Sequence, residues 1–401
     1  MTDTDTKSEA ATDEQLVRER CEQLLRDNDP TGDAVAFLGA QYDLGLAWVN
    51  FPEGAGGLGL SPKLQRTIQG MIADAGGPHP YARNPIGYGM GAPTIVTHGS
   101  DEQKARLLRP LFTGEEVWCQ MFSEPGAGSD VAALGTSAVR DGDEWVVNGQ
   151  KVWTTLAHLS RWGMLVARTD PSQPKHKGMT YFVIDMHSPG VEVRPLYQIT
   201  GEAEFNEVFF TDARIPDSGR LSDPGDGWRV VLTTLMNERV SIGGQTPAKG
   251  GGFIGEAMKV WKASGSTDPV RRDRLTDLWI KAEVLRLTNI RAGQLRAKGT
   301  PGPEGSIGKI LSADLNKAIS ELTVDILGAE GMLKPSGYPM DRPKRAMMWD
   351  DPTQAFLRAR ANSIEGGTTE IAKNILGERV LGLPGDVRVD KVLPWSEVPR
   401  S

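Results

Sequence analysis

The feature that most constrains the fold of this chain is its hydrophobic periodicity, which changes twice along the sequence. From 13 to 116 apolar residues recur at helical spacing, and we expect Leu16, Cys21 and Leu24 on one face of the first helix. From 117 to 220 short β-rich pieces separated by turns replace this spacing, and from 221 to 401 helical spacing returns. The chain is also too long for one compact core. We therefore predict an α+β multidomain fold, with a small β-barrel or sandwich between two helical domains.

Local signals add detail to these three domains. Ser100 followed by Gln103 predicts a capping box at the start of a helix. The turn sequence at 141–143, Asp-Gly-Asp, predicts a hairpin between two strands of the middle domain. Residues 1–12 are rich in Thr, Asp, Ser and Ala, so we expect them to be disordered.

Charge and composition argue against several classes of function. The net charge is -7 and no run of Lys and Arg occurs, so nucleic-acid binding is not expected. No stretch approaches ~18 consecutive apolar residues, and the polar N-terminus does not resemble a signal peptide, so we expect no membrane span and a cytoplasmic location. Cys21 and Cys119 are far apart and the five histidines are scattered, which argues against a disulfide framework or a metal site.

One glycine-rich segment, Met121–Asp130, has the composition of a ligand-binding loop. Gly126 and Gly128 allow the backbone to approach a ligand closely, and Ser123 and Ser129 can donate hydrogen bonds to it. A turn without a ligand is the simpler interpretation of such a segment taken alone.

A second segment, Val146–Thr155, follows at short distance. Trp153 offers a flat face, and the hydroxyl of Thr155, two residues further on, points to the same side of a strand. Together the two segments suit a flat heteroaromatic ring, which composition alone does not name.

These two segments, with the motifs EPGAGSD and NGQKVW, resemble the acyl-CoA dehydrogenase family. Three further stretches fit the same resemblance, at Glu204–Pro216, Ile326–Gly331 and Gly366–Pro384. The resemblance implies a helical N-terminal domain, a middle β-barrel and a C-terminal four-helix bundle. It also implies FAD, an acyl-CoA substrate oxidised to the trans-2-enoyl-CoA, flavin N5 as hydride acceptor and electron-transfer flavoprotein as the reoxidising partner. No GxGxxG motif follows a predicted strand, so a Rossmann mode of dinucleotide binding is not implied.

Carried over to this sequence, the resemblance implies a set of binding residues. The flavin ring would meet Gln120, Met121, Phe122, Ser123, Gly128, Ser129, Trp153, Thr154 and Thr155. The adenine end would meet residues of a neighbouring subunit, namely Asp325, Ile326, Leu327, Gly328, Ala329, Thr368 and Glu370. The thioester would lie beside Ser129, Arg239 and Gly366.

The catalytic base is the point at which the family divides. In many members it directly precedes the Gly-Thr of the C-terminal motif, where this chain has Gly366, which cannot accept a proton. Glu365 is adjacent but matches a position that points elsewhere. In isovaleryl-CoA and long-chain acyl-CoA dehydrogenases the base is a Glu on a helix, and their pattern places it at Glu238 here. We therefore predict Glu238 as the base, with Arg239 as a charged neighbour, although a Glu-Arg pair on a helix is often only a surface ion pair.

The chain departs from the family at the Arg-x-x-Phe-Gly element that meets the FAD diphosphate. Met258, Trp261 and Lys262 stand at the Arg, Phe and Gly positions. Four cations could replace the missing Arg, namely Lys259, Lys262, Arg271 and Arg272. Because some family members pair two unlike subunits around each flavin, a homotetramer and a mixed tetramer are both expected alternatives, and an insertion between Gly331 and Phe356 could bear on that contact. An acyl-CoA oxidase, another flavoprotein on the same fold or a silent partner subunit are the competing functions.

Overall fold

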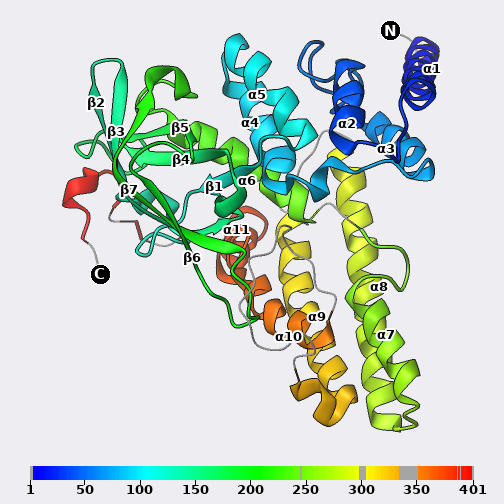
Figure 1. The fold of residues 1–401 in the computed structure, drawn as a ribbon. Coiled ribbons are helices and arrows are strands. Elements are labelled where there is room, and N and C mark those ends of the chain that lie inside the picture. The colour runs from blue at the N-terminus through cyan, green and yellow to red at the C-terminus, as the bar shows by residue number, and fades with distance from the viewer. Residues whose placement is uncertain are drawn as a thin grey trace.

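The computed structural model describes residues 3–243, 246–297, 304–333, 351–385, 387–388 and 390–399. Helices form the N-terminal part, a sheet forms the middle, and long helices form the C-terminal part (Figure 1). The order helical, β, helical that the periodicity predicts is therefore confirmed. Residues 334–350, which make up most of the insertion after Gly331, lie outside the described residues. None of the helices in the described ranges is long and apolar enough to cross a membrane.

The N-terminal part consists of five α-helices. They are α1 (Asp3–Asp27), α2 (Ala34–Asp43), α3 (Gln65–Asp74), α4 (Ala92–His98) and α5 (Asp101–Thr113). The predicted capping box is present at the start of α5, where Ser100 accepts from the backbone N–H of Gln103 and the Gln103 side chain accepts in return. A left-handed Gly114 (φ 73°) ends the helix.

Helix α1 begins earlier than the sequence led us to expect. Residues 3–12, which we expected to be disordered, continue the helix that ends at Asp27. Lys7, Glu9, Ala10 and Ala11 are good helix formers, so the segment can extend a helix whose later turns are anchored by burial. The anchoring residues are Val17, Cys21 and Leu24, which are fully buried, whereas Leu16 is partly exposed.

The middle part is a seven-stranded sheet. Its strands are β1 (Trp118–Met121), β2 (Ser137–Asp141), β3 (Glu144–Thr155), β4 (Trp162–Arg168), β5 (Met179–Asp185), β6 (Val191–Pro195) and β7 (Phe205–Pro216). The order is β1-β4-β2-β3-β7-β6, and β5 pairs with β4. Gly142 (φ 63°) turns the predicted β2–β3 hairpin. Closure of this sheet into a barrel stays a prediction.

The C-terminal part is helical. It contains α6 (Gly227–Gly243), α7 (Phe253–Ser264), α8 (Pro269–Ala297), α9 (Glu304–Leu327), α10 (Pro352–Arg358) and α11 (Thr369–Arg379). Helices α7, α8 and α9 share a core that includes Ile254, Leu278 and Leu322. In Figure 1 these three helices extend away from the sheet, whereas α11 lies close beneath it. A four-helix bundle in the family's sense stays a prediction.

One hydrophobic core joins the N-terminal helices, the sheet and α6. It includes Leu108 of α5, Trp118 of β1, Tyr181 of β5 and Val230 of α6. The hydroxyl of Thr234 on α6 lies 2.9 Å from that of Thr94 on α4 and 3.1 Å from that of Tyr181. Because all three hydroxyls are buried, these bonds fix both the position and the rotation of α6.

Candidate active site

The predicted base lies on α6, one turn beyond Thr234. The Glu238 side chain is half-buried, and its carboxylate accepts a hydrogen bond of 3.1 Å from the Gln120 amide on β1. The bond brings together two residues that are 118 positions apart in the sequence. A carboxylate therefore stands beside the strand that leads into Met121, Phe122 and Ser123.

A buried lysine fixes the segment 122–124, which follows β1. Lys151 of β3 is fully buried, and its ammonium donates to the carbonyl oxygen of Phe122 (3.1 Å) and to the carboxylate of Glu124 (2.8 Å). The backbone N–H of Val152 also donates to the carbonyl of Ser123 (2.9 Å). Strand β3 therefore determines the path of the chain through 122–124.

The carboxylate of Glu124 anchors the far end of the same loop. It accepts from the backbone N–H groups of Gly135 (2.7 Å) and Thr136 (2.9 Å). Burial alone would raise the pKa of the Glu124 carboxyl, but the neighbouring Lys151 ammonium and these hydrogen bonds outweigh it and hold that pKa below its usual range. Glu124 is therefore ionised at neutral pH and closes the loop 124–136 at its base.

Between these anchors the loop presents an open backbone. A Cβ placed on Gly126 or on Gly128 would meet no heavy atom within 4 Å among the described residues. Ser129 is exposed beside them, and Met121 and Phe122 are buried. The prediction that both glycines allow a close approach therefore has a geometric basis.

Strand β3 is irregular where the predicted ring-binding residues lie. Its pairing with β7 shifts register between Lys151 and Thr154, and Trp153 has φ 60°. A positive φ at a bulky residue costs about 1–3 kcal/mol and persists only where the surroundings enforce it. The Trp153 ring is 56% exposed and meets Phe205 edge to face at 5.7 Å. This bulge directs a large aromatic ring outward from the sheet.

The next residue, Thr154, points the other way. Its hydroxyl is buried and has no hydrogen-bond partner among the residues that the structure describes. Its carbonyl accepts from the buried Asn206 amide (3.1 Å), which fixes the strand end. Thr155, the third predicted residue, pairs with Phe205 of β7 and is half-buried.

The alternative base, Glu365, is committed to a structural ion pair. Its carboxylate accepts from the Arg358 guanidinium (2.7 Å) and from the Asn362 amide (2.7 Å). Arg358 is only 5% exposed, and it also faces Glu204 at 3.5 Å. Gly366 follows with φ 63°, a left-handed backbone that glycine adopts without strain.

The residues predicted for the adenine end are divided between two places. Asp325, Ile326, Leu327, Gly328 and Ala329 lie at the C-terminal end of α9, which in Figure 1 is remote from the sheet. Thr368 caps α11 by accepting from the N–H of Ile371, and Glu370 lies exposed in its first turn. Within one chain the structure does not bring the α9 group to Trp153. The side chain of Arg239 lies outside those that the structure describes.

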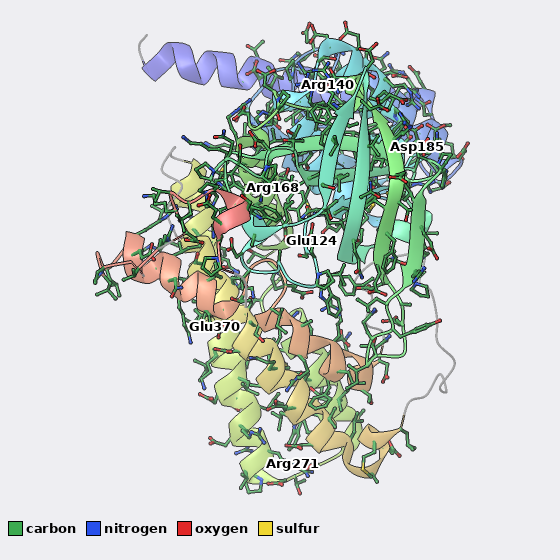
Figure 2. The ribbon with its side chains drawn as sticks, turned by 90° about the vertical axis from the view of Figure 1, so that its left-hand side faces the viewer. Glu124, Arg140, Arg168, Asp185, Arg271 and Glu370 are labelled. Atoms are coloured by element: carbon green, nitrogen blue, oxygen red, sulfur yellow. The ribbon has the colours of Figure 1, made fainter. Side chains whose placement is uncertain are left out.

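The position where the family carries an Arg also has a defined environment. Met258 of α7 packs against the core between α7, α8 and α9. Of the four cations that could replace the Arg, Lys259 pairs with Glu256 (2.8 Å), and Arg271 lies at the end of the helical part remote from the sheet (Figure 2).

A large pocket opens beside α6. Its volume is about 800 Å³, and its wall includes Asn237, which directly precedes Glu238. The remaining wall comes from the N-terminal part and combines aromatic with polar side chains: Trp48, Asn50, Phe51, Pro62, Lys63, Gln65, Arg66, Gln69, His79, Tyr81, Tyr88, Gly89 and Pro93. Trp48 stacks on Tyr88 at 5.3 Å, and burial raises the pKa of the Tyr88 hydroxyl.

Neither this pocket nor the Lys151–Glu124 pair was predicted from the sequence. The pocket wall combines residues that are scattered over 48–93, so no contiguous motif in the sequence predicts the pocket. The ion pair of Lys151 was predictable in principle. Lys151 occupies a core-facing position of a strand, and a buried charge there needs a partner. Glu124, inside the loop motif itself, is that partner.

Three family models match successive parts of the chain. They describe the acyl-CoA dehydrogenase N-terminal domain (7–115), middle domain (119–213) and C-terminal domain (225–381). Among curated proteins, the chain is 39% identical over 345 residues to acyl-CoA dehydrogenase IpdE1 of Mycobacterium tuberculosis, a match that covers 86% of each chain. It is 40% identical to acyl-CoA dehydrogenase FadE34 of the same organism, over 86% of this chain and 46% of that protein.

Solved structures agree on the fold. The Tcur3481-Tcur3483 steroid ACAD superposes with a TM-score of 0.71 at 23% identity and covers 94% of this chain and 98% of that one. The ChsE4-ChsE5 complex from Mycobacterium tuberculosis superposes with a TM-score of 0.68 at 25% identity over the same shares. With three domain models in chain order and a relative 39% identical over most of both lengths, the chain belongs to the acyl-CoA dehydrogenase family and is an oxidoreductase of that family.

Proposed function

We propose that the chain oxidises an acyl-CoA thioester to the trans-2-enoyl-CoA with FAD, and that Glu238 removes the α-proton. The observation that carries this proposal is the half-buried Glu238 carboxylate, 3.1 Å from Gln120 on the strand that enters the loop 121–130. The alternative carboxylate, Glu365, already accepts hydrogen bonds from the Arg358 guanidinium (2.7 Å) and the Asn362 amide (2.7 Å). Glu238 instead lies beside the strand that enters the loop 121–130, so Glu238 is the better candidate for the base.

The residues around Trp153 fit a flavin. Bound FAD would supply the acceptor for the hydride that leaves the β-carbon. The outward Trp153 ring would cover one side of the flavin ring, and the half-buried Thr155, two residues further on, is the proposed hydroxyl contact. The open backbone at Gly126 and Gly128 allows a large planar group to approach.

The thioester would be activated by backbone donors. Proton removal next to a carbonyl becomes easier when hydrogen bonds to the carbonyl oxygen strengthen as enolate charge develops. The backbone N–H of Gly366, in a left-handed conformation after the Arg358-bound Glu365, is our candidate donor. In this proposal the Arg358–Glu365 pair therefore serves to position the backbone of Gly366.

The acyl group is proposed to be bulky. A pocket of about 800 Å³ lies in the upper part of the range for ligand sites, and its wall, which includes Trp48, Phe51 and Tyr88, adjoins the helix that carries the base. One solved neighbour is also a steroid ACAD. We infer a fused-ring or strongly branched acyl chain.

Filling the pocket tests this inference. Gln69→Phe is expected to lower kcat/KM for a CoA thioester of a fused-ring acid at least about tenfold relative to butyryl-CoA, since pocket mismatches of this size cost roughly 10–200-fold. Gly70→Phe is the matched control, because it adds the same ring at a neighbouring exposed position with no atom within 4 Å of a new Cβ. Equal effects of the two changes would contradict the assignment of the pocket.

Anaerobic flavin bleaching separates the proposed reaction from its closest alternative. Acyl-CoA should bleach the flavin without oxygen, and an electron-transfer flavoprotein or an artificial acceptor should restore it. An acyl-CoA oxidase on the same fold would instead form peroxide rapidly in air. If peroxide forms in air as fast as the flavin is bleached, the chain is an acyl-CoA oxidase and the proposed dehydrogenase function is wrong.

We propose a mixed tetramer in preference to a homotetramer. Ile280, Val284 and Leu287 of α8 are each about half exposed and recur at the spacing of one helix face, which favours a further apolar contact. Met258 replaces the Arg that in the family meets a neighbour's FAD, and the ChsE4-ChsE5 neighbour is a complex of two named chains.

Mass photometry combined with a flavin assay tests the mixed tetramer. We expect less than full flavin occupancy for the chain alone and full occupancy with a related subunit. A fully loaded tetramer of this chain alone would contradict the mixed assembly.

A further inference from the structure

The C-terminal segment 390–399 packs on the middle sheet and not on the helices that precede it. Figure 1 shows this end of the chain, in red, beside the strands. The backbone N–H of Trp395 donates to the carbonyl of Gln173 (2.9 Å), and that of Ser396 donates to the carbonyl of Pro171 (3.1 Å). The segment thus forms a backbone-paired strap, which we call the C-terminal strap, along the loop between β4 and β5.

The side chain of Trp395 reaches from this strap to the segment that follows Ser129. Its indole N–H donates to the carbonyl of Ala133 (3.2 Å), and its ring lies against the Arg168 guanidinium at 4.9 Å. Figure 2 shows Arg168 beside the red C-terminal segment. Arg168 is buried and donates to the carbonyls of Ala132 (2.6 Å) and Leu134 (3.4 Å). Trp395 and Arg168 therefore hold three successive carbonyls of one short stretch.

A buried ammonium makes the second connection. Lys175 is largely buried and binds the carboxylate of Asp130 (2.6 Å) on one side and that of Asp390 on the other. Burial opposes the charge of Lys175, but its two carboxylate partners raise its pKa above the usual value. Asp390 thus links the start of the strap, through one cation, to the residue directly after Ser129.

These contacts complete the support of the loop 124–136. Its base is closed by Glu124 and Lys151 from inside the sheet, and its outer arm, 130–134, is held by Lys175, Arg168 and the strap. Between the two supports lie the exposed residues Gly128 and Ser129. Their position therefore depends on both supports.

We propose that the C-terminal strap is a positioning element for acyl-CoA binding, in which Asp390 and Trp395 hold the segment 130–134 and thereby orient Ser129. The proposal rests on the proposed function, because Ser129 is one of the residues expected beside the thioester. Neither Asp390 nor Trp395 is expected to touch substrate. Their loss should raise the KM for acyl-CoA and leave kcat nearly unchanged.

The test combines amide hydrogen exchange with steady-state kinetics on the full-length protein. Trp395→Ala and Asp390→Asn should each accelerate exchange in peptides covering 130–135 by about tenfold, without changing exchange in β5 or the FAD content. KM for acyl-CoA should rise by a similar factor, with kcat within about twofold. Val392→Ala, a change at a strap residue that is 78% exposed, should alter neither quantity.

Trp395→Phe provides a milder change that keeps an aromatic ring but removes the indole N–H and the second ring; it should give an intermediate effect. Unchanged exchange over 130–135 in Trp395→Ala, Asp390→Asn and Trp395→Phe would overturn the proposal. A fall in kcat at constant KM in these variants would also overturn it. The exchange measurement needs no substrate. It therefore decides the positioning role even if no acyl-CoA bleaches the flavin, a result that would overturn the proposed function instead.

Discussion

Replacing Glu238 with Gln is expected to slow flavin reduction by acyl-CoA about 10³–10⁴-fold and to leave the flavin bound, since a positioned base contributes about 10²–10⁴-fold. The change keeps the shape of the side chain and its contact with Gln120, 3.1 Å away. It removes only the ability to accept a proton. Rapid-mixing absorbance at the flavin band, under anaerobic conditions and with saturating substrate, measures this step directly.

Glu365→Gln is the matched control for this prediction. Its carboxylate faces the 95% buried Arg358, so the change weakens a buried ion pair and should lower thermal stability while reducing flavin reduction only a few-fold. If Glu238→Gln retains near-normal turnover and Glu365→Gln does not, the base is Glu365 and the proposed assignment is wrong.

The fold was readable from the sequence because its signals are local. Alternating apolar residues and turn pairs marked the strands of the middle part, and the Ser100–Gln103 box marked the start of α5. The start of α1 was not readable, because polar residues such as those at 3–12 join a helix only when later turns are buried. The burial of Val17 in preference to Leu16 is a similar case, decided by packing against α3.

The residues of the candidate site could be predicted from the sequence only where they form a contiguous motif. The two segments at 121–130 and 146–155 do meet, but the positive φ of Trp153 and the bulge beside it arise from strand pairing, which no local pattern encodes. The bond between Glu238 and Gln120 spans 118 residues and depends on how α6 lies on the sheet. The pocket and the C-terminal strap likewise depend on long-range packing, so neither could be predicted from local patterns.

The Lys151–Glu124 pair shows what such a missed contact contributes. Removing one partner of a buried pair leaves an uncompensated charge and costs about 3–5 kcal/mol. Lys151→Met should therefore leave the Glu124 carboxylate without its cation and remove the hydrogen bond to the Phe122 carbonyl, which weakens the base of the loop. We expect the melting temperature to fall on the order of 10 °C and FAD to be lost during gel filtration.

The double variant Lys151→Met/Glu124→Gln separates charge burial from loop support. Removing both charges should recover a large part of the stability lost in Lys151→Met, because no buried charge is left unpaired. It should not recover flavin binding, because the bonds to Phe122, Gly135 and Thr136 are lost or weakened. The exposed pair Lys259–Glu256, with side chains 74% and 66% exposed, is the control, and Lys259→Met should change stability by less than about 1 kcal/mol. A melting temperature as high in Lys151→Met as in Lys259→Met would show that the buried pair does not stabilise the loop, and the support of the flavin segment would then have to come from the backbone bonds of β3 alone.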